Sequence, residues 1–412
     1  MDVVYERCCG LDVHKRMVVA CLLTPGQLGQ PRKDVRTFGT MTTDLLRLAD
    51  WLGAEGCTHV AMEGTGVYWQ PIWNLLEDRF VLVLVNARHA KAVPGRKTDV
   101  KDAEWLADLL RHGLLAGSFV PDREQRELRE LTRYRTALLR ERAAAANRVQ
   151  KTLEGANIKL ASVVTDITGK SGRAISRART NGETDPDRLA ELAEGRLREK
   201  LPVLRQALVG SFGAHQRFLV AQQLDHLEFL DGRIEQVSNE IAGRTRPAAE
   251  AIARLDAIPG VGQRTAEVLV AEIGTDMGRF PTADHLASWA GMCPGNHQSA
   301  GRQQSGRTRK GSPWLRAALA EAAQAAGRTK GSALQAQYRR LAARRGKQRA
   351  TVAVGHAILR IAYSLLKDPT STYEERGAQD ADRRDQQATE RHLASRLQRL
   401  GYKVTLAPIG AT

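Results

Sequence analysis

The order of apolar segments across residues 7–115 limits most strongly what this chain can fold into. Two apolar runs, RCCGLDVH and RMVVACLLT, indicate strands joined by a tight turn at His14 and Lys15, and DVRTFGT indicates a third strand. A helix-spaced segment (TTDLLRLADWLGAEG), a buried strand (THVAMEG), a helix (WQPIWNLLEDR), an apolar strand (FVLVLVN) and a further helix then follow. This alternation predicts a mixed α/β domain.

Three strands followed by helix, strand, helix, strand and helix is the element order of RNase H-like domains, and we expect one over residues 1–120. In such a sheet the first and fourth strands are neighbours, and the last helix packs over their ends.

The rest of the chain is expected to be mainly helical. Long charged helices with spaced leucines, such as REQRELRELTRYRTALLRERAAAANRVQ, predict a coiled-coil dimerisation region over 121–250. Its middle, TDITGKSGRAISRARTNGETDPDRLAEL (165–192), is polar and turn-rich, and residues 198–250 are expected to return to helix. Residues 251–372 predict a second compact unit, and 373–412 a polar tail with the short amphipathic segment HLASRLQRLGYKVTL.

The charge balance indicates a polyanionic partner. Lys and Arg number 62 against 46 Asp and Glu among 412 residues, giving +16. Nucleic acid is the favoured partner and an anionic membrane surface the weaker alternative. Aromatic residues make up 5%, which disfavours stacking on single strands as the main binding mode. No apolar run approaches the ~20 residues that span a bilayer, so we expect a cytoplasmic protein.

The five cysteines do not form a recognisable metal or disulfide motif. Four lie near the N-terminus in predicted strands, and the set is Cys8, Cys9, Cys21, Cys57 and Cys293. The spacing gives neither a CxxC pair nor a zinc pattern, so we interpret them as small buried residues in a reducing compartment.

Four acids of the N-terminal segment indicate a metal site. Asp12 stands inside an apolar strand, where a carboxylate is costly unless it is paired or bound to a cation. Glu63 ends a buried strand, and Asp99 and Asp102 lie three apart at a helix start, on one face. In the expected sheet all four converge, and because carboxylates repel one another they need a cation such as Mg²⁺.

Structural interpretations compete with this one. Asp99 can cap the helix, Asp102 can be a favourable first-turn acid, and Glu63 can be an ordinary residue at a strand end. Asp12 has the weakest structural alternative, because its strand is otherwise apolar.

The segment IPGVGQRTA is typical of a helix-hairpin-helix. Gly260 and Gly262 make a tight hairpin whose backbone N–H groups can face a phosphate, binding DNA backbone without reading sequence. A plain packing corner between two helices is the alternative.

Near the cluster of acids, Lys97 and Lys101 are candidate phosphate contacts.

A glycine-rich arm follows the predicted helix-hairpin-helix, with the sequence GMCPGNHQSAGRQQSGRTRKGSPWLRAAL. Small residues and arginines allow close approach to phosphates, and the candidate contacts are Arg302, Arg307, Arg309, Lys310 and, on the next helix, Arg316. Ser299, Ser305 and Ser312 are each open to interpretation as a phosphate contact, a turn residue or a nucleophile, within what can also be a solvated basic loop.

Six segments together resemble transposases of the insertion sequence 110 family, in the same order and over nearly the whole chain. They are LDVHK, MEGTGVYW, NARHAKAVPGRKTDVKDAEWLADLL, IPGVGQRTA, GMCPGNHQSAGRQQSGRTRKG and LRAAL. The resemblance implies a RuvC-like domain with a DEDD metal site, a coiled-coil dimerisation region and a C-terminal domain with a nucleophilic serine. It also implies recombination of double-stranded DNA directed by a non-coding bridge RNA, in dimers to tetramers of a prokaryotic protein.

Carried onto this sequence, the family's metal site matches Asp12, Glu63, Asp99 and Asp102, and its serine matches Ser299. Ala300 stands where the family often has glycine, so Ser305 is the reserve nucleophile. We expect Mg²⁺-dependent cleavage with a covalent phosphoserine intermediate. Two rival functions are a metal-only junction nuclease without a covalent intermediate, and a non-catalytic nucleic-acid-binding scaffold.

Overall fold

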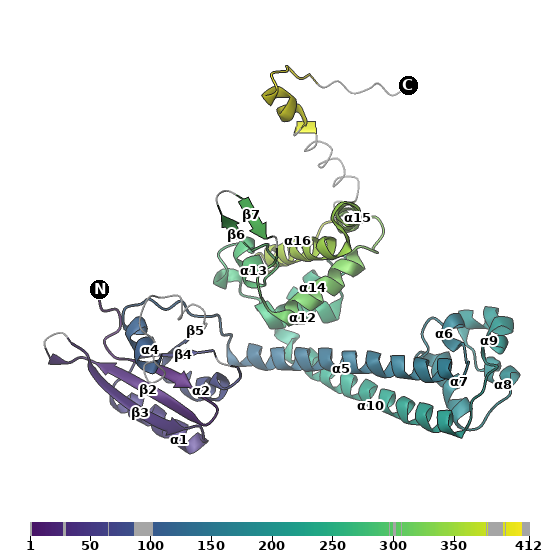
Figure 1. Ribbon diagram of the computed structural model, residues 1–412, viewed down its shortest axis with the longest axis horizontal. Helices are drawn as coiled ribbons and strands as arrows, with labels where there is room; N and C mark the ends of the chain where they lie inside the picture. The colour runs from purple at the N-terminus through teal and green to yellow at the C-terminus, as the bar shows by residue number, and fades with distance from the viewer. Residues whose placement is uncertain are drawn as a thin grey trace. The chain divides into compact units, whose positions relative to one another are not determined.

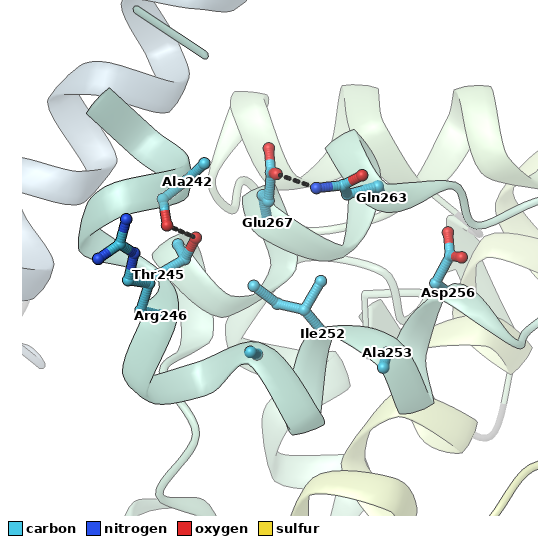
Figure 2. Close-up of a pocket in the computed structure, with 9 residues that line it drawn as sticks. Ala242, Thr245, Arg246, Ile252, Ala253, Asp256, Gln263 and Glu267 are labelled. Carbon is cyan, nitrogen blue, oxygen red and sulfur yellow. Dashed lines mark hydrogen bonds between the residues drawn. The ribbon is translucent and has the colours of Figure 1, made fainter. Parts of the chain in front are cut away.

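The computed structural model describes residues 2–27, 30–64, 66–85, 102–295, 297–299, 302–305, 307–375, 377, 390–391 and 393–405 (Figure 1). For residues 297–299 and 302–305 the description covers the backbone alone. The chain divides into two compact units, Met1–Arg123 and Glu124–Thr412.

The first unit is built on a mixed five-stranded sheet with the order β3-β2-β1-β4-β5. Its strands are β1 (Cys8–Val13), β2 (Met17–Thr24), β3 (Arg32–Gly39), β4 (His59–Glu63) and β5 (Val81–Val85). Strand β1 pairs antiparallel with β2 and parallel with β4, and β4 pairs parallel with β5. The expected neighbouring of the first and fourth strands is therefore observed, within the predicted α/β fold class.

Helices cover both faces of this sheet. They are α1 (Thr42–Ala54), α2 (Trp69–Leu76) and α4 (Asp102–Arg111). Cys9 and Leu11 pack into the core shared with α1 and α2, whereas Cys8 packs with α4. Burial on both faces explains why β1 is a continuous apolar run. Cys57, expected in a strand, lies two residues before β4.

Gly10 lets α4 lie directly on β1. A Cβ at this position would stand 2.2 Å from the carbonyl oxygen of Ala103 and 2.5 Å from the backbone nitrogen of Ala107. Because any larger residue would collide with the backbone of α4, the glycine sets the distance between helix and sheet.

Two long helices, α5 (Arg123–Gly155) and α10 (Ala214–Arg244), run side by side as a hairpin (Figure 1). Leucines of both helices, including Leu153 and Leu227, share one buried core with the short helices between them. Those are α6 (Leu160–Val163), α7 (Lys170–Thr180), α8 (Pro186–Glu191), the 3₁₀ helix η3 (Gly195–Lys200) and α9 (Leu201–Ala207).

Helices α7 and α8 correct the interpretation of residues 165–192 as a turn-rich segment, whereas α9 lies in the part that was expected to be helical. Ile175, Leu189 and Leu204 are buried among them, so the segment carries part of a core. Each helix is so short that it buries few apolar residues, which leaves too little periodicity for a sequence pattern to reveal it.

The remaining helices pack around α16 (Lys347–Lys367), which buries Val354 and Ile358 in their shared core. Before it come η4 (Arg246–Ala248), α11 (Ala249–Asp256), α12 (Gln263–Ile273), η5 (Met277–Arg279), α13 (Ala283–Trp289), the strands β6 (His297–Ser299) and β7 (Arg302–Ser305), α14 (Pro313–Ala326) and α15 (Ala333–Arg345). Residues 393–399 are helical. In the described ranges, no helix is both long and apolar enough to cross a membrane.

Candidate active site and nucleic-acid interface

Asp12 and Glu63 occupy matching positions on neighbouring parallel strands. The pairing of β1 with β4 runs as far as Leu11 opposite Met62, and the two acids are the next residue on each strand. Side chains alternate between the faces of a sheet, so Asp12 shares the face of Gly10, and Glu63 that of Ala61. Both of those residues contact or pack with α4, which puts the two acids on the face that α4 covers.

Asp102 lies at the start of α4, and the direction of this helix carries it toward the same edge. The carbonyl oxygen of Arg111, at the other end of α4, accepts hydrogen bonds from Val4 and Tyr5, which precede β1. Since Ala103 contacts Gly10 further along β1, α4 runs antiparallel to β1. Its N-terminus therefore faces the carboxyl ends of β1 and β4.

Asp99, the fourth predicted ligand, lies outside the described residues, as do Lys97 and Lys101. Within the described part of the chain, no three acidic, histidine or cysteine side chains form a cluster that could hold a metal ion. The donors nevertheless suit a hard divalent cation, because Asp12, Glu63 and Asp102 offer carboxylate oxygens from three elements at one sheet edge.

His14 is a neighbour that the sequence pattern did not single out. Its Nε2 lies 3.0 Å from Oδ2 of Asp12, whose side chain is 17% exposed. His14 follows β1 in the turn to β2, and one strand residue separates it from Asp12. The contact orients the Asp12 carboxylate, and the only signal in the sequence was the spacing of two in DVH.

The two glycines of the predicted helix-hairpin-helix have different surroundings. Gly260 has φ +86°, and a Cβ there would lie 2.3 Å from the carbonyl oxygen of Ala322 on α14. Gly262 precedes α12, is exposed, and a Cβ there would meet nothing within 4 Å. Gly260 thus serves helix packing, while the backbone at Gly262 is open to a ligand.

The glycine-rich arm forms a β-hairpin. Ser299 pairs with Arg302 at one end of the two strands, and His297 pairs with Ser305 at the opposite end. A bridge between Pro294 and Thr308 closes the stem. The backbone therefore brings both candidate serines onto one ribbon. The side chains of Ser299, Arg302 and Ser305 lie outside the described residues.

Arg316 and Ser312 make hydrogen bonds in the segment that leads from this hairpin into α14. The guanidinium of Arg316 donates to Thr308 Oγ1 at 3.0 Å and to the carbonyl oxygen of Arg309 at 3.3 Å. The Ser312 hydroxyl caps α14 by accepting from the nitrogen of Leu315. These bonds give both residues structural roles, whereas Arg307, Arg309 and Lys310 are exposed.

Glu272 is a buried acid that the sequence analysis missed. It is 1% exposed on α12 and accepts from Arg133 Nε at 2.8 Å and Arg133 Nη2 at 3.0 Å. Its Oε2 also accepts from the Ser312 hydroxyl at 3.0 Å. One carboxylate therefore joins α5, α12 and the start of α14. The signal was an acid inside the apolar run VLVAEIG.

Comparisons with known proteins agree over two parts of the chain. A DEDD transposase model of the IS110 family matches residues 9–158, and a model described as "Transposase IS116/IS110/IS902 family" matches residues 252–339. A Pseudomonas aeruginosa protein named "Probable family 20 transposase" is 28% identical over 318 residues, covering 76% of this chain and 84% of that protein.

These matches define the chain as a transposase, an enzyme that cuts and rejoins DNA. It belongs to the insertion sequence 110 family. A DEDD-type transposase depends on divalent metal ions, and its substrate is DNA.

Proposed function

We propose that this transposase is an RNase H-like recombinase whose Asp12, Glu63, Asp99 and Asp102 hold Mg²⁺ and whose Ser299 is the nucleophile. The observation that carries the proposal is the register of β1 and β4, which aligns Asp12 with Glu63 on the face beneath α4. An acid pair at this position has no structural role that the surrounding apolar strands require.

When bound, Mg²⁺ stabilises negative charge on the scissile phosphate and its attacking and leaving oxygens. The four carboxylates orient the cation, and His14 holds Asp12 in place through the 3.0 Å contact. Lys97 and Lys101, beside the acids in sequence, contact the flanking phosphates.

Ser299 acts by transesterification. Its Oγ forms a bond to the scissile phosphorus as the bond from phosphorus to one strand oxygen breaks. The serine proton passes to water, and the released strand end takes up a proton as a hydroxyl. After strand exchange, a hydroxyl of the partner strand attacks the phosphoserine, the Oγ–P bond breaks and serine regains its proton. The reaction conserves the number of phosphodiester bonds.

The arm supplies positive charge around this serine. Arg302, Arg307, Arg309 and Lys310 hold the DNA backbone or stabilise the charge that develops on the phosphorus. Arg316 holds the segment that leads from the hairpin into α14 through its bonds to Thr308 and Arg309. At the open backbone of Gly262, the N-terminus of α12 contributes a further phosphate contact.

The helical hairpin of α5 and α10 dimerises the protein, and dimers pair into tetramers. The supporting observation is the exposure of Phe218 (65%) and Phe229 (55%), eleven residues apart on α10. Eleven residues make three helical turns, so both rings lie on one side of the helix. A non-coding bridge RNA selects the donor and target DNA by base pairing.

A covalent-trapping assay tests the nucleophile. Wild-type protein incubated with a labelled DNA substrate, its RNA and Mg²⁺ should yield a denaturant-stable protein–DNA adduct. Ser299→Ala should lose the adduct yet still bind DNA, and Ser305→Ala should retain it. Adduct that persists in Ser299→Ala and vanishes in Ser305→Ala would transfer the role to Ser305.

A metal-only nuclease is the second candidate, because the acids alone suffice for hydrolysis by water. It predicts that cleaved DNA accumulates in Ser299→Ala without any adduct in the wild type. The same assay therefore separates the two functions.

A further inference from the structure

A groove of about 480 Å³ lies between α5, α12 and α14 in the second unit. Its charged and aromatic lining comprises Arg135, Arg140, Arg264, Trp314 and Glu321, and Thr136 and Thr265 add hydroxyl groups. Three of these residues carry positive charge and one carries negative charge, so the groove favours an anion.

Two of the arginines have no ion-pair partner among the described residues. Arg140 and Arg264 are exposed, and neither makes an ion pair with another described residue. They approach the groove from different helices, Arg140 from α5 and Arg264 from the first turn of α12. Exposed arginines that converge without an acidic partner are typical of phosphate-binding surfaces.

Arg135 supplies the observation that points to a ligand. It is 2% exposed, and its Nη1 donates to Glu267 Oε2 at 2.6 Å. Its Nη2 is buried and has no hydrogen-bond partner in the described part of the chain. A buried guanidinium nitrogen without an acceptor is costly, and a ligand oxygen in the groove would satisfy it.

The start of α12 reinforces this preference for an anion. The helix runs over 11 residues, and its N-cap, Gly262, provides no side-chain hydrogen bond. Arg264 and Thr265 of its first turn both line the groove. Unsatisfied N–H groups and the helix dipole at an N-terminus favour negative charge.

The surroundings of Trp314 indicate which part of a nucleic acid the groove can bind. The guanidinium carbon of Arg140 lies 5.3 Å from the centre of the Trp314 ring. Because Arg140 already covers this ring, a base cannot stack on the same face. Together with the arginines, this favours the sugar-phosphate backbone over a base stacked on that face.

We infer that this groove binds a phosphodiester of duplex DNA, with Arg140 and Arg264 as the outer contacts and Arg135 Nη2 as the inner one. The inference rests on DNA being the substrate of this transposase and is independent of which serine is the nucleophile. The proposed binding site includes the contact predicted at Gly262 and adds the residues of the long helix α5 that line the groove.

The test measures binding of full-length protein to a labelled DNA duplex by fluorescence anisotropy over a series of salt concentrations, without Mg²⁺. In the Arg140→Ala/Arg264→Ala variant, the slope of log K against log salt should become less steep by about 2, since each lost phosphate contact changes it by ~0.9. The Arg140→Lys/Arg264→Lys variant should keep the wild-type slope, because lysine preserves the charge.

Arg148→Ala is the matched control, since Arg148 is an exposed arginine on α5 that does not line the groove. Its slope should equal that of the wild type. An unchanged slope in the double alanine variant, an equal loss in Arg148→Ala, or a loss seen only with an RNA duplex would overturn the inference. Ser299→Ala should bind with the wild-type slope, so failure of the serine mechanism remains distinguishable.

Discussion

Asp12 and Glu63 stand side by side at the carboxyl ends of the parallel strands β1 and β4, each one residue past the last register pair, Leu11 with Met62. Alternation along both strands turns the two side chains toward α4, the helix that begins with Asp102. Residues fifty-one positions apart in the sequence thus meet through a single register, which no local pattern specifies.

Replacing either acid should strongly slow metal-dependent DNA cleavage while leaving the fold intact. We expect Asp12→Asn and Glu63→Gln each to slow cleavage at least about a hundredfold, which corresponds to ~3 kcal/mol of lost transition-state stabilisation. Single-turnover cleavage in Mg²⁺ measures the rate, and circular dichroism checks the fold.

Asp34→Asn is the control for these variants, because Asp34 is an acid of the same sheet that pairs with Arg36 at 2.9 Å. It should cleave at the wild-type rate. Wild-type rates in Asp12→Asn would remove Asp12 from the proposed metal site.

Gly10→Ala should destabilise the first unit by about 1–3 kcal/mol, the usual cost of overpacking. Its new Cβ would meet backbone atoms of α4 at 2.2 and 2.5 Å, which cannot rotate away. Cleavage should fall as well, because the N-terminus of α4 carries Asp102. Urea unfolding and the cleavage assay measure the two effects.

Gly53→Ala provides the comparison within the same unit. A Cβ at Gly53, in the last turn of α1, would meet only the flexible end of Arg79, at 2.9 Å. Because alanine favours a helix over glycine, this variant should be as stable as the wild type or gain up to ~1 kcal/mol. Equal destabilisation by both substitutions would contradict the role assigned to Gly10.

Removing one partner of the buried ion pair between Arg135 and Glu267 should lower the free energy of unfolding more than replacing both partners with apolar residues. Arg135→Met leaves Glu267, 3% exposed, with Gln263 as its remaining hydrogen-bond donor at 3.2 Å. We expect a loss of about 3–5 kcal/mol, and a smaller loss or none in Arg135→Met/Glu267→Met. A double-mutant cycle by chemical denaturation measures the coupling. Additive losses would show that the pair does not act as a unit.

Stability should fall in alkaline solution as cysteine thiols of the first unit ionise. Burial raises the pKa of Cys8 to about 12 and that of Cys21 to about 11, from an ordinary value of 9.0. Between these values the unfolded chain releases protons that the folded protein retains, so stability decreases as pH rises. Each thiol contributes up to ~1.4 kcal/mol per pH unit, and its full contribution is present below pH 9.

Urea unfolding at about pH 8 and about pH 10 measures this effect. The Cys8→Ala/Cys21→Ala variant should show a shallower decrease than the wild type. A decrease of the same size would assign the alkaline sensitivity to other groups.

Much of the fold can be predicted from the sequence because its signals are local. Periods of two and 3.6 in residues 7–115 indicate the strands and helices of the first unit, and the spaced leucines indicate α5 and α10. Helices α7 and α8 were not predicted, since each buries too few apolar residues to form a pattern. Their core exists only when Ile175, Leu189 and Leu204 meet.

The sequence by itself determined most kinds of element and the basic character of the chain, and it predicts the acids and serines that we propose for the site. Only the tertiary structure decided which residues are neighbours. Register aligned Asp12 with Glu63, Gly10 brought α4 onto β1, and Glu272 joined Arg133 to Ser312. Local preference acts over a few residues along the chain, whereas packing and strand pairing join residues far apart in it, and the site depends on the second.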